Sequence, residues 1–189
     1  VLVNVNLEAD GSARVTQQLT LTNATPADRA EGPPERLGYE TSWLKSAYYL
    51  YVPDSATKFK PSYPVGFTVR PFRGHRQLGG GWIDDGFGHR FIRLVGWTPP
   101  GDQSAVSVTY ELPAGTFSGG DTSGDSRTLT YRVQAEVQSL LNDSTITFQV
   151  TGPEGFTPIR QPGMKISEAT GTLSAGQSGP VNAEMGFTR

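Results

Sequence analysis

Apolar and polar residues alternate with a period of two along much of this chain, and this spacing constrains the fold more than any other feature. The alternation runs through residues 1–8, 106–112 and 129–137. Successive side chains of a strand point to opposite faces, so each such segment buries one face in a core and exposes the other. Asp10-Gly11 follows the first segment, and this dipeptide suits the turn of a tight hairpin.

Helical periodicity is scarce by comparison. A parallel α/β sheet needs helical stretches of about 10–15 residues between its strands, and the sequence contains none. Many short strands separated by turn residues are instead typical of a sandwich. We therefore predict an all-β fold, an antiparallel β-sandwich that is immunoglobulin-like in general architecture, with little or no helix.

A small, polar, glycine-rich stretch at 118–126 separates two strand-rich parts of the chain. Its composition is that of a flexible linker. The sequence thus predicts a β-sandwich domain over residues 1–117, a flexible connection over 118–126 and a smaller β-rich part over 127–189. Because the last part is short for an independent domain, one continuous sandwich over residues 1–189 is the alternative.

Composition excludes several classes of protein. The chain contains no Cys, which rules out a disulfide scaffold, a thiolate zinc site and a cysteine nucleophile. The net charge is −2 and the basic residues are scattered, so we expect no nucleic-acid partner. No apolar run approaches the roughly 18 residues of a membrane helix, so we expect no membrane insertion by this segment. We predict no cofactor.

Both histidines, His75 and His89, lie in the glycine-rich stretch 71–90 beside Asp84 and Asp85. Imidazole and carboxylate groups are metal ligands and general acid–base groups. However, no rigid element fixes their spacing, and the chain has no G-x-S-x-G nucleophile elbow. We therefore predict neither a metal site nor catalytic residues.

We interpret residues 67–95 as a long hairpin extension with a turn at Asp85-Gly86 and with Trp82 and Phe87 folded back on the sheet. Its many glycines raise the entropic cost of ordering the backbone. We therefore expect the tip near Gln77–Gly81 to be the most mobile part of the first domain, as hydrogen exchange would show.

Two types of side chain in the sequence offer binding chemistry. Aromatic rings stack on flat or apolar ligand faces when they are exposed, although they are more often core residues. Arginine forks bind carboxylates and phosphates. The candidate binding residues, for a glycan or for a partner surface, are Trp43, Tyr49, Trp82, Arg73 and Arg76. Trp97 is a further aromatic residue that could stack on a ligand if it is exposed.

Several motifs follow one another in a specific order: DGSARVTQQLTLTN, an aromatic strand ending in YVPDSA, FIRLVGW leading into TPPGDQSAVSVTYELPAG, and STITFQVTGPEGF. In this order the chain resembles the β-rich C-terminal extracytoplasmic region of uncharacterised actinobacterial membrane-anchored envelope proteins. The resemblance covers most of residues 1–157. It implies a position at the cell surface or in the envelope, with tethering by a segment outside these 189 residues, and it carries over no catalytic residue.

Taken together, these features favour a non-catalytic extracytoplasmic module, structural or protein-binding, of a larger bacterial envelope protein. The alternative is a carbohydrate-binding module for cell-wall glycans. The expected partner is accordingly an envelope protein or a cell-wall glycan. For a glycan, two or three of Trp43, Tyr49, Trp82 and Trp97 need to be exposed and roughly coplanar.

Overall fold

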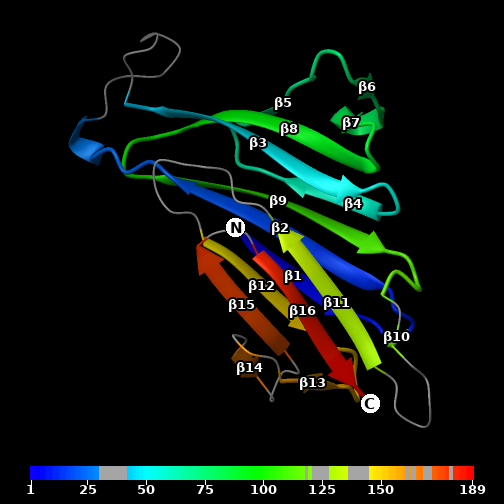
Figure 1. The fold of residues 1–189 in the computed structure, drawn as a ribbon. Helices are drawn as coiled ribbons and strands as arrows, with labels where there is room; N and C mark the ends of the chain where they lie inside the picture. The colour runs from blue at the N-terminus through cyan, green and yellow to red at the C-terminus, as the bar shows by residue number, and fades with distance from the viewer. Residues whose placement is uncertain are drawn as a thin grey trace. The chain divides into compact units, whose positions relative to one another are not determined.

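Strands make up nearly all of the regular structure of this chain (Figure 1). Its helical elements, among the residues described, are the single 3-10 turns η1 (Ala27–Arg29) and η3 (Gly79–Gly81). In that same part of the chain, no helix is long and apolar enough to cross a membrane. The predicted all-β, sandwich-like class is confirmed. The computed structural model describes residues 1–29, 42–117, 119–120, 128–135, 145–160, 162, 165–167, 172–178 and 181–189.

The chain forms two compact units, and each is assembled from separate stretches of sequence. Unit 1 consists of Val1–Gln17, Ser55–Phe59 and Thr109–Arg189, and unit 2 consists of Gln18–Asp54 and Lys60–Val108. The flexible connection predicted at 118–126 lies outside the described residues, apart from Gly119 and Gly120. The domain boundaries derived from it therefore stay a prediction.

Unit 1 contains strands of two sheets. The larger sheet has the strand order β14-β15-β12-β1-β2-β9-β4, and the smaller has the order β10-β11-β16-β13. Three of these strands, β2, β4 and β9, also contribute residues to unit 2. The strands are β1 (Leu2–Leu7), β2 (Ala13–Thr22), β4 (Thr57–Ser62), β9 (Gln103–Leu112), β10 (Gly119–Gly120), β11 (Thr128–Ala135), β12 (Thr145–Thr151), β13 (Thr157–Ile159), β14 (Lys165–Ser167), β15 (Thr172–Ser178) and β16 (Val181–Thr188).

One pairing in unit 1 departs from the predicted antiparallel pattern. Strands β1 and β12 run parallel, with Leu2 opposite Thr147 and Asn6 opposite Thr151. Alternation specifies which face of a strand is buried, but it does not specify the direction of the neighbouring strand. A parallel pair needs a long connection, and the intervening chain from β2 to β11 supplies it.

The core of unit 1 comes from both of its sheets. Val5 and Val15 are fully buried on the larger sheet, and Met185 and Phe187 are fully buried on β16 of the smaller one. A Cβ atom at Gly152, next to the end of β12, would lie 2.4 Å from the Phe187 ring. Glycine at this position therefore permits the close approach of the backbone to the ring.

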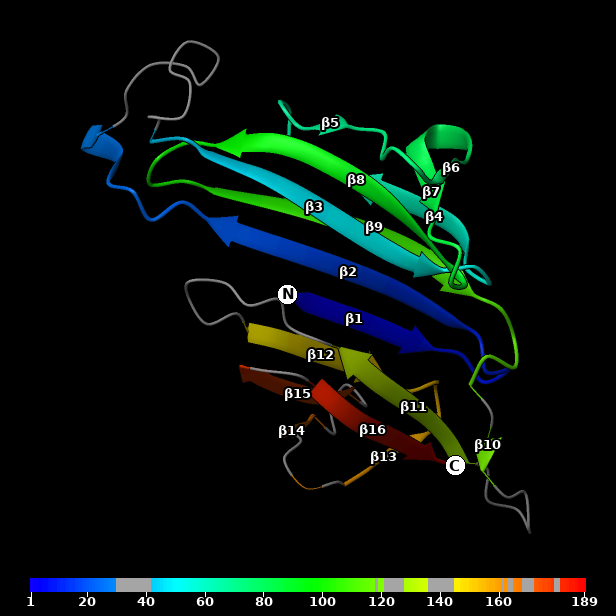
Figure 2. The same ribbon diagram turned by 45° about the horizontal axis from the view of Figure 1, so that its top comes forward.

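Unit 2 contains a sheet of order β3-β8-β7-β6, in which β5 also pairs with β8. Strand β8 is central: β3 pairs with its whole length, and β7 and β5 follow its other edge (Figure 2). Portions of β2, β4 and β9 complete this unit. The strands of this sheet are β3 (Leu44–Pro53), β5 (Thr68–Val69), β6 (Arg76–Gln77), β7 (Trp82–Asp84) and β8 (His89–Thr98).

Residues 67–95 contain more internal structure than a plain hairpin. Thr68 pairs with Val95, and the chain between them forms β6, η3 and β7. Trp82 is buried at 4% exposure, as predicted. Phe87 does not fold back on the sheet, because it is 86% exposed. The mobility expected near the tip stays a prediction.

Side chains in the core of unit 2 follow the alternation of β3 and β8. Leu50 on β3 and Leu94 on β8 are fully buried, and Tyr48 is buried whereas its neighbour Tyr49 is only half-buried on the opposite face. Gly96 continues the buried face of β8, and the Phe67 ring occupies the space that a side chain would fill there.

We expect Gly96→Ala to lower the free energy of unfolding by about 1–3 kcal/mol, the usual cost of an overpacked core. The added Cβ would lie 2.4–2.6 Å from three atoms of the Phe67 ring. Urea denaturation followed by tryptophan fluorescence measures the change. Gly79→Ala is the control, since nothing lies within 4 Å of a Cβ at that position. Equal midpoints for the two variants would contradict the prediction.

Candidate functional site

Unit 2 contains a hollow of about 410 Å³. Small-molecule sites occupy about 300–1,000 Å³. The indoles of Trp43 and Trp97 line it, together with Phe67 from the β4–β5 connection and Asp102 and Gln103 from the start of β9. We call this feature the Trp hollow. It brings together Trp43, a predicted binding residue, and Trp97.

The Trp hollow exposes apolar surface to solvent. Val65 lines the hollow and is fully exposed, whereas Trp43 and Trp97 are half-buried. Gly66 follows Val65 with φ +92°, a left-handed backbone conformation that favours glycine. The connection between β4 and β5 therefore turns at Gly66 and leaves the Val65 side chain in solvent.

Lys45 orders the indole of Trp97 from the neighbouring strand. The two residues are opposite each other in the β3–β8 register, and Lys45 Nζ lies 5.2 Å from the Trp97 ring centroid. A cation over the face of an indole is attracted by its negative π surface. The ring is therefore held by a charged neighbour in addition to its packing.

A network of buried hydrogen bonds adjoins the hollow at Ser104. Ser104, which lines it, is 5% exposed, and its Oγ lies 2.7 Å from Oγ1 of the fully buried Thr98. Asn23 Nδ2 donates to the carbonyl oxygens of Thr98 at 3.1 Å and Ser42 at 2.8 Å. A buried amide costs free energy unless it is hydrogen-bonded, and these bonds satisfy both of its hydrogens.

The backbone of Asn23 also fixes the turn that carries Asp102. Asn23 N–H donates to the Asp102 carbonyl at 2.9 Å, and its own carbonyl accepts from Gly101 N–H at 3.0 Å. The Asn23 side chain accepts from Thr25 N–H at 3.1 Å. Sequence analysis missed this positioning role. The signal that would have found it is a short polar residue at the end of a strand, which often bonds to the backbone two residues later.

Tyr49 lies in a different aromatic cluster, on the outer face of the unit 2 sheet. Its ring centroid is 6.0 Å from those of both Phe72 and Phe91. The guanidinium of Arg93 lies 5.9 Å from the Tyr49 centroid and 5.8 Å from that of Phe72, and its Nη1 donates to the Pro71 carbonyl. Tyr49 therefore packs among rings and does not join the Trp hollow.

The remaining predicted binding residues are spread over unit 2. Trp82 is buried, so its ring presents no face to a ligand here. Arg73 is exposed, and Arg76 is exposed with its Nη1 3.9 Å from Asp84 Oδ2. His75 contacts the rings of Phe72 and Phe91 at 5.1 and 6.0 Å. The structure thus brings Trp43 and Trp97 together but separates them from the two arginines.

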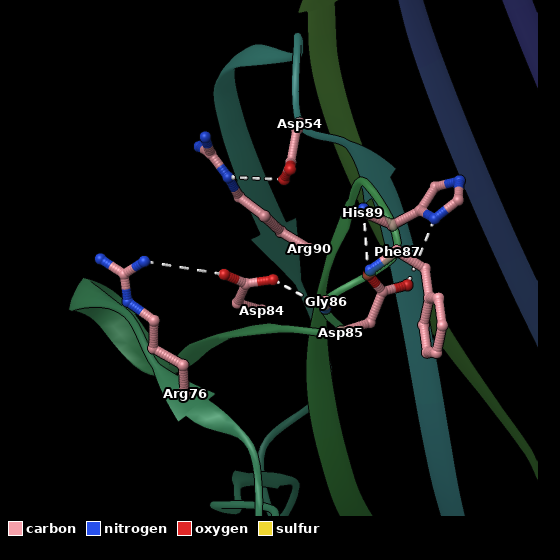
Figure 3. Close-up of polar contacts among 8 residues, drawn as sticks. All are labelled: Asp54, Arg76, Asp84, Asp85, Gly86, Phe87, His89 and Arg90. Atoms are coloured by element: carbon pink, nitrogen blue, oxygen red, sulfur yellow. Dashed lines mark hydrogen bonds and ion pairs between the residues drawn. The ribbon is translucent and has the colours of Figure 1, made fainter.

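The β7–β8 turn holds the acidic pair Asp84 and Asp85 in hydrogen bonds to its own backbone (Figure 3). Asp84 Oδ1 accepts from Gly86 N–H at 2.8 Å. Asp85 Oδ1 accepts from the N–H groups of Phe87 at 2.7 Å and His89 at 3.1 Å. These bonds order the turn that displays Phe87.

His89 pairs with one carboxylate of this turn. Its Nδ1 lies 3.2 Å from Asp85 Oδ2. Beside this pair, Arg90 Nε donates to Asp54 Oδ1 at 3.2 Å and joins β8 to the residue that follows β3 (Figure 3). Within the ranges that the structure describes, no three His, Cys, Asp or Glu residues are grouped to hold a metal ion.

Burial by itself raises the pKa of the Asp85 carboxyl group, but its hydrogen bonds and a neighbouring charge together outweigh this effect. The N–H groups of Phe87 and His89 and the charge of the His89 imidazole lower the pKa of Asp85 below its usual value. The ionised carboxylate is therefore the form that stabilises the turn.

No protein-family model matches the chain, and no curated protein matches it.

We expect Asp85→Asn to lower the free energy of unfolding at pH 7. A carboxyl group with a lowered folded-state pKa contributes stability above its unfolded pKa, about 3.9, and loses it as the pH falls through the folded value. The difference between variant and wild type should therefore shrink below about pH 4. Urea unfolding at pH 7, 5 and 3 measures it. Phe87→Ala, which keeps the N–H that Asp85 accepts, is the control, and a pH-independent difference for Asp85→Asn would contradict the assignment.

Proposed function

We propose that this chain is a non-catalytic interaction module of a larger bacterial envelope protein, and that it binds a partner protein at the Trp hollow. The observation that carries the proposal is the apolar lining of that hollow, to which the fully exposed Val65 and the half-buried Trp43 and Trp97 contribute. Trp side chains are enriched at protein–protein interfaces because they combine a large apolar ring with a polar N–H group.

The chemistry of the hollow is that of a protein interface. Such interfaces have an apolar centre enriched in aromatic residues and a polar, wet rim. Trp43, Trp97 and Val65 supply the apolar centre, and Asp102 and Gln103 supply exposed polar groups beside it. The hydrogen bonds of Asn23 hold the turn of Asp102 in place. This turn therefore loses little conformational entropy when a partner binds.

Both histidines have contacts that support a structural role, which favours the non-catalytic part of the proposal. His75 packs on Phe72 and Phe91, and His89 pairs with Asp85 inside the turn that Asp85 organises. The position outside the cytoplasm is supported by the resemblance of the chain to actinobacterial envelope proteins, carried by segments such as YVPDSA and FIRLVGW.

Val65→Asp tests this proposal with little risk to the fold, because the Val65 side chain is fully exposed. A photo-crosslinking residue at Val65, in the chain expressed in its source cells, should yield one defined adduct with an envelope protein. A second chain carries the crosslinking residue at Gln103, with and without Val65→Asp. We expect the substitution to remove most of the adduct, because a charge at an apolar interface centre weakens binding by about 2 kcal/mol or more. Thr20, exposed on β2, is the matched control position. Equal adducts from Val65 and Thr20 would reject the proposal.

A cell-wall glycan is the second candidate. None of the four rings expected to be exposed for such a site is so, since Trp43, Tyr49 and Trp97 are half-buried and Trp82 is buried. The candidate is favoured instead by the pairing of two indoles with a carboxylate and a carboxamide in one hollow. Indole faces pack on the C–H surfaces of sugars, and Asp102 and Gln103 offer groups that bond to hydroxyls. Titration with soluble cell-wall polysaccharide should then change the emission of Trp43 and Trp97. Gln103→Ala should weaken the response about tenfold, the effect of roughly one hydrogen bond. An unchanged emission spectrum at saturating polysaccharide would exclude this candidate.

A further inference from the structure

Strand β3 forms one edge of the unit 2 sheet (Figure 2). Among the described strands it pairs with β8 alone, through all ten residues from Leu44 to Pro53. No backbone hydrogen bond outside that ladder involves residues 44–53 in the described part of the chain. Within the described ranges, the opposite edge of β3 therefore carries backbone donors and acceptors that no strand receives.

The contacts of β8 show which residues of β3 face that free edge. The Arg93 carbonyl accepts from Arg70 N–H, on the side of β8 away from β3. In an antiparallel pair the bonded and non-bonded positions alternate, so Tyr49, opposite Arg93, directs its own N–H and C=O away from β8. The His89 carbonyl accepts from Asp85 N–H in the same way, and its partner Pro53 has no N–H to donate.

The same alternation shows which other residues of β3 direct their backbone groups to the free edge. Lys45, Ala47, Tyr49 and Tyr51 direct their backbone groups outward. Natural edges are blunted by Lys and Pro. Here Lys45 and Pro53 lie near the two ends of the strand, and the stretch between them carries neither residue type.

We propose that the free edge of β3 pairs antiparallel with the β3 edge of a second copy of this chain, across a two-fold axis at Tyr48. In this register Ala47 of one copy faces Tyr49 of the other, and Lys45 faces Tyr51. Each copy donates four N–H groups and accepts with four carbonyls. Identical edges of one protein meet most simply in such a self-complementary, closed arrangement.

The side chains fit this register. Each cross-strand pair on the outer face sets a small residue against a ring or an ammonium group against a ring, and no like charges meet. Tyr51 is 45% exposed, and Lys45 and Ala47 are exposed, so these side chains have space for a neighbour. On the inner face Ser46 lies opposite Leu50, which again sets a small side chain against a large one.

Ala47→Pro tests the pairing because it removes an outward N–H that the β3–β8 ladder does not use. Sedimentation velocity of the full chain should show a concentration-dependent dimer. The variant should dissociate about 30-fold more readily, since two hydrogen bonds are lost across the axis. Circular dichroism checks the fold, and Ala47→Glu replaces this variant if it does not fold. A wild-type chain that stays monomeric at several hundred micromolar overturns the proposal.

Crosslinking tests the register itself, because the natural chain contains no Cys. Chains with Ala47→Cys and chains with Tyr49→Cys are mixed and mildly oxidised. This mixture should form a disulfide-linked dimer much faster than a mixture of Ala47→Cys with Lys45→Cys chains. In the proposed register positions 47 and 45 of the two copies are not opposite each other, so their thiols do not meet. Equal rates in the two mixtures, or crosslinking in neither, overturn the proposal.

Discussion

The pairing of β8 with strands on both of its edges is the interaction on which unit 2 depends. Its carbonyls alternate in direction: that of Arg93 accepts from Arg70 on one side, and that of Gly88, just before the strand, accepts from Asp54 on the other. A buried strand must satisfy its backbone groups in this way. β3 pairs with β8 along its whole length, and β7 and β5 pair with the other edge of β8 over residues 90–92 and 94–95. The β3–β8 register places Lys45 opposite Trp97 and determines which edge of β3 remains open.

Small residues let this sheet approach its neighbours closely. Gly96 makes room for the Phe67 ring, and Phe67 in turn lies 5.6 Å from Tyr48, ring centroid to ring centroid. The hydroxyl of Tyr48 donates to the Ser104 carbonyl. This chain of contacts runs from the core of unit 2 to the lining of the Trp hollow. The same packing that stabilises the unit therefore positions its candidate binding surface.

The structure separates two kinds of aromatic residue that look alike in sequence. Trp43 and Trp97 line the Trp hollow, whereas Tyr49, Phe72 and Phe91 pack against one another around Arg93. Alternation places Tyr49 on the outer face of its strand, but it does not say that the segment after β5 returns to cover that face. That coverage, together with the burial of Trp82, decides which rings have a surface left for a partner.

The all-β class, the inward faces of β1 and β9, and the turn at Asp85-Gly86 could be predicted from the sequence. These features follow from local rules, namely the two-residue period of strands and the side-chain bonds of Asp to nearby N–H groups. The parallel pairing of β1 with β12, the exposure of Phe87 and the joint lining of one hollow by Trp43 and Trp97 could be seen only once the chain had folded. The reason is physical: strand direction, neighbour identity and exposure depend on contacts between residues far apart in the chain, and local alternation carries no information about them.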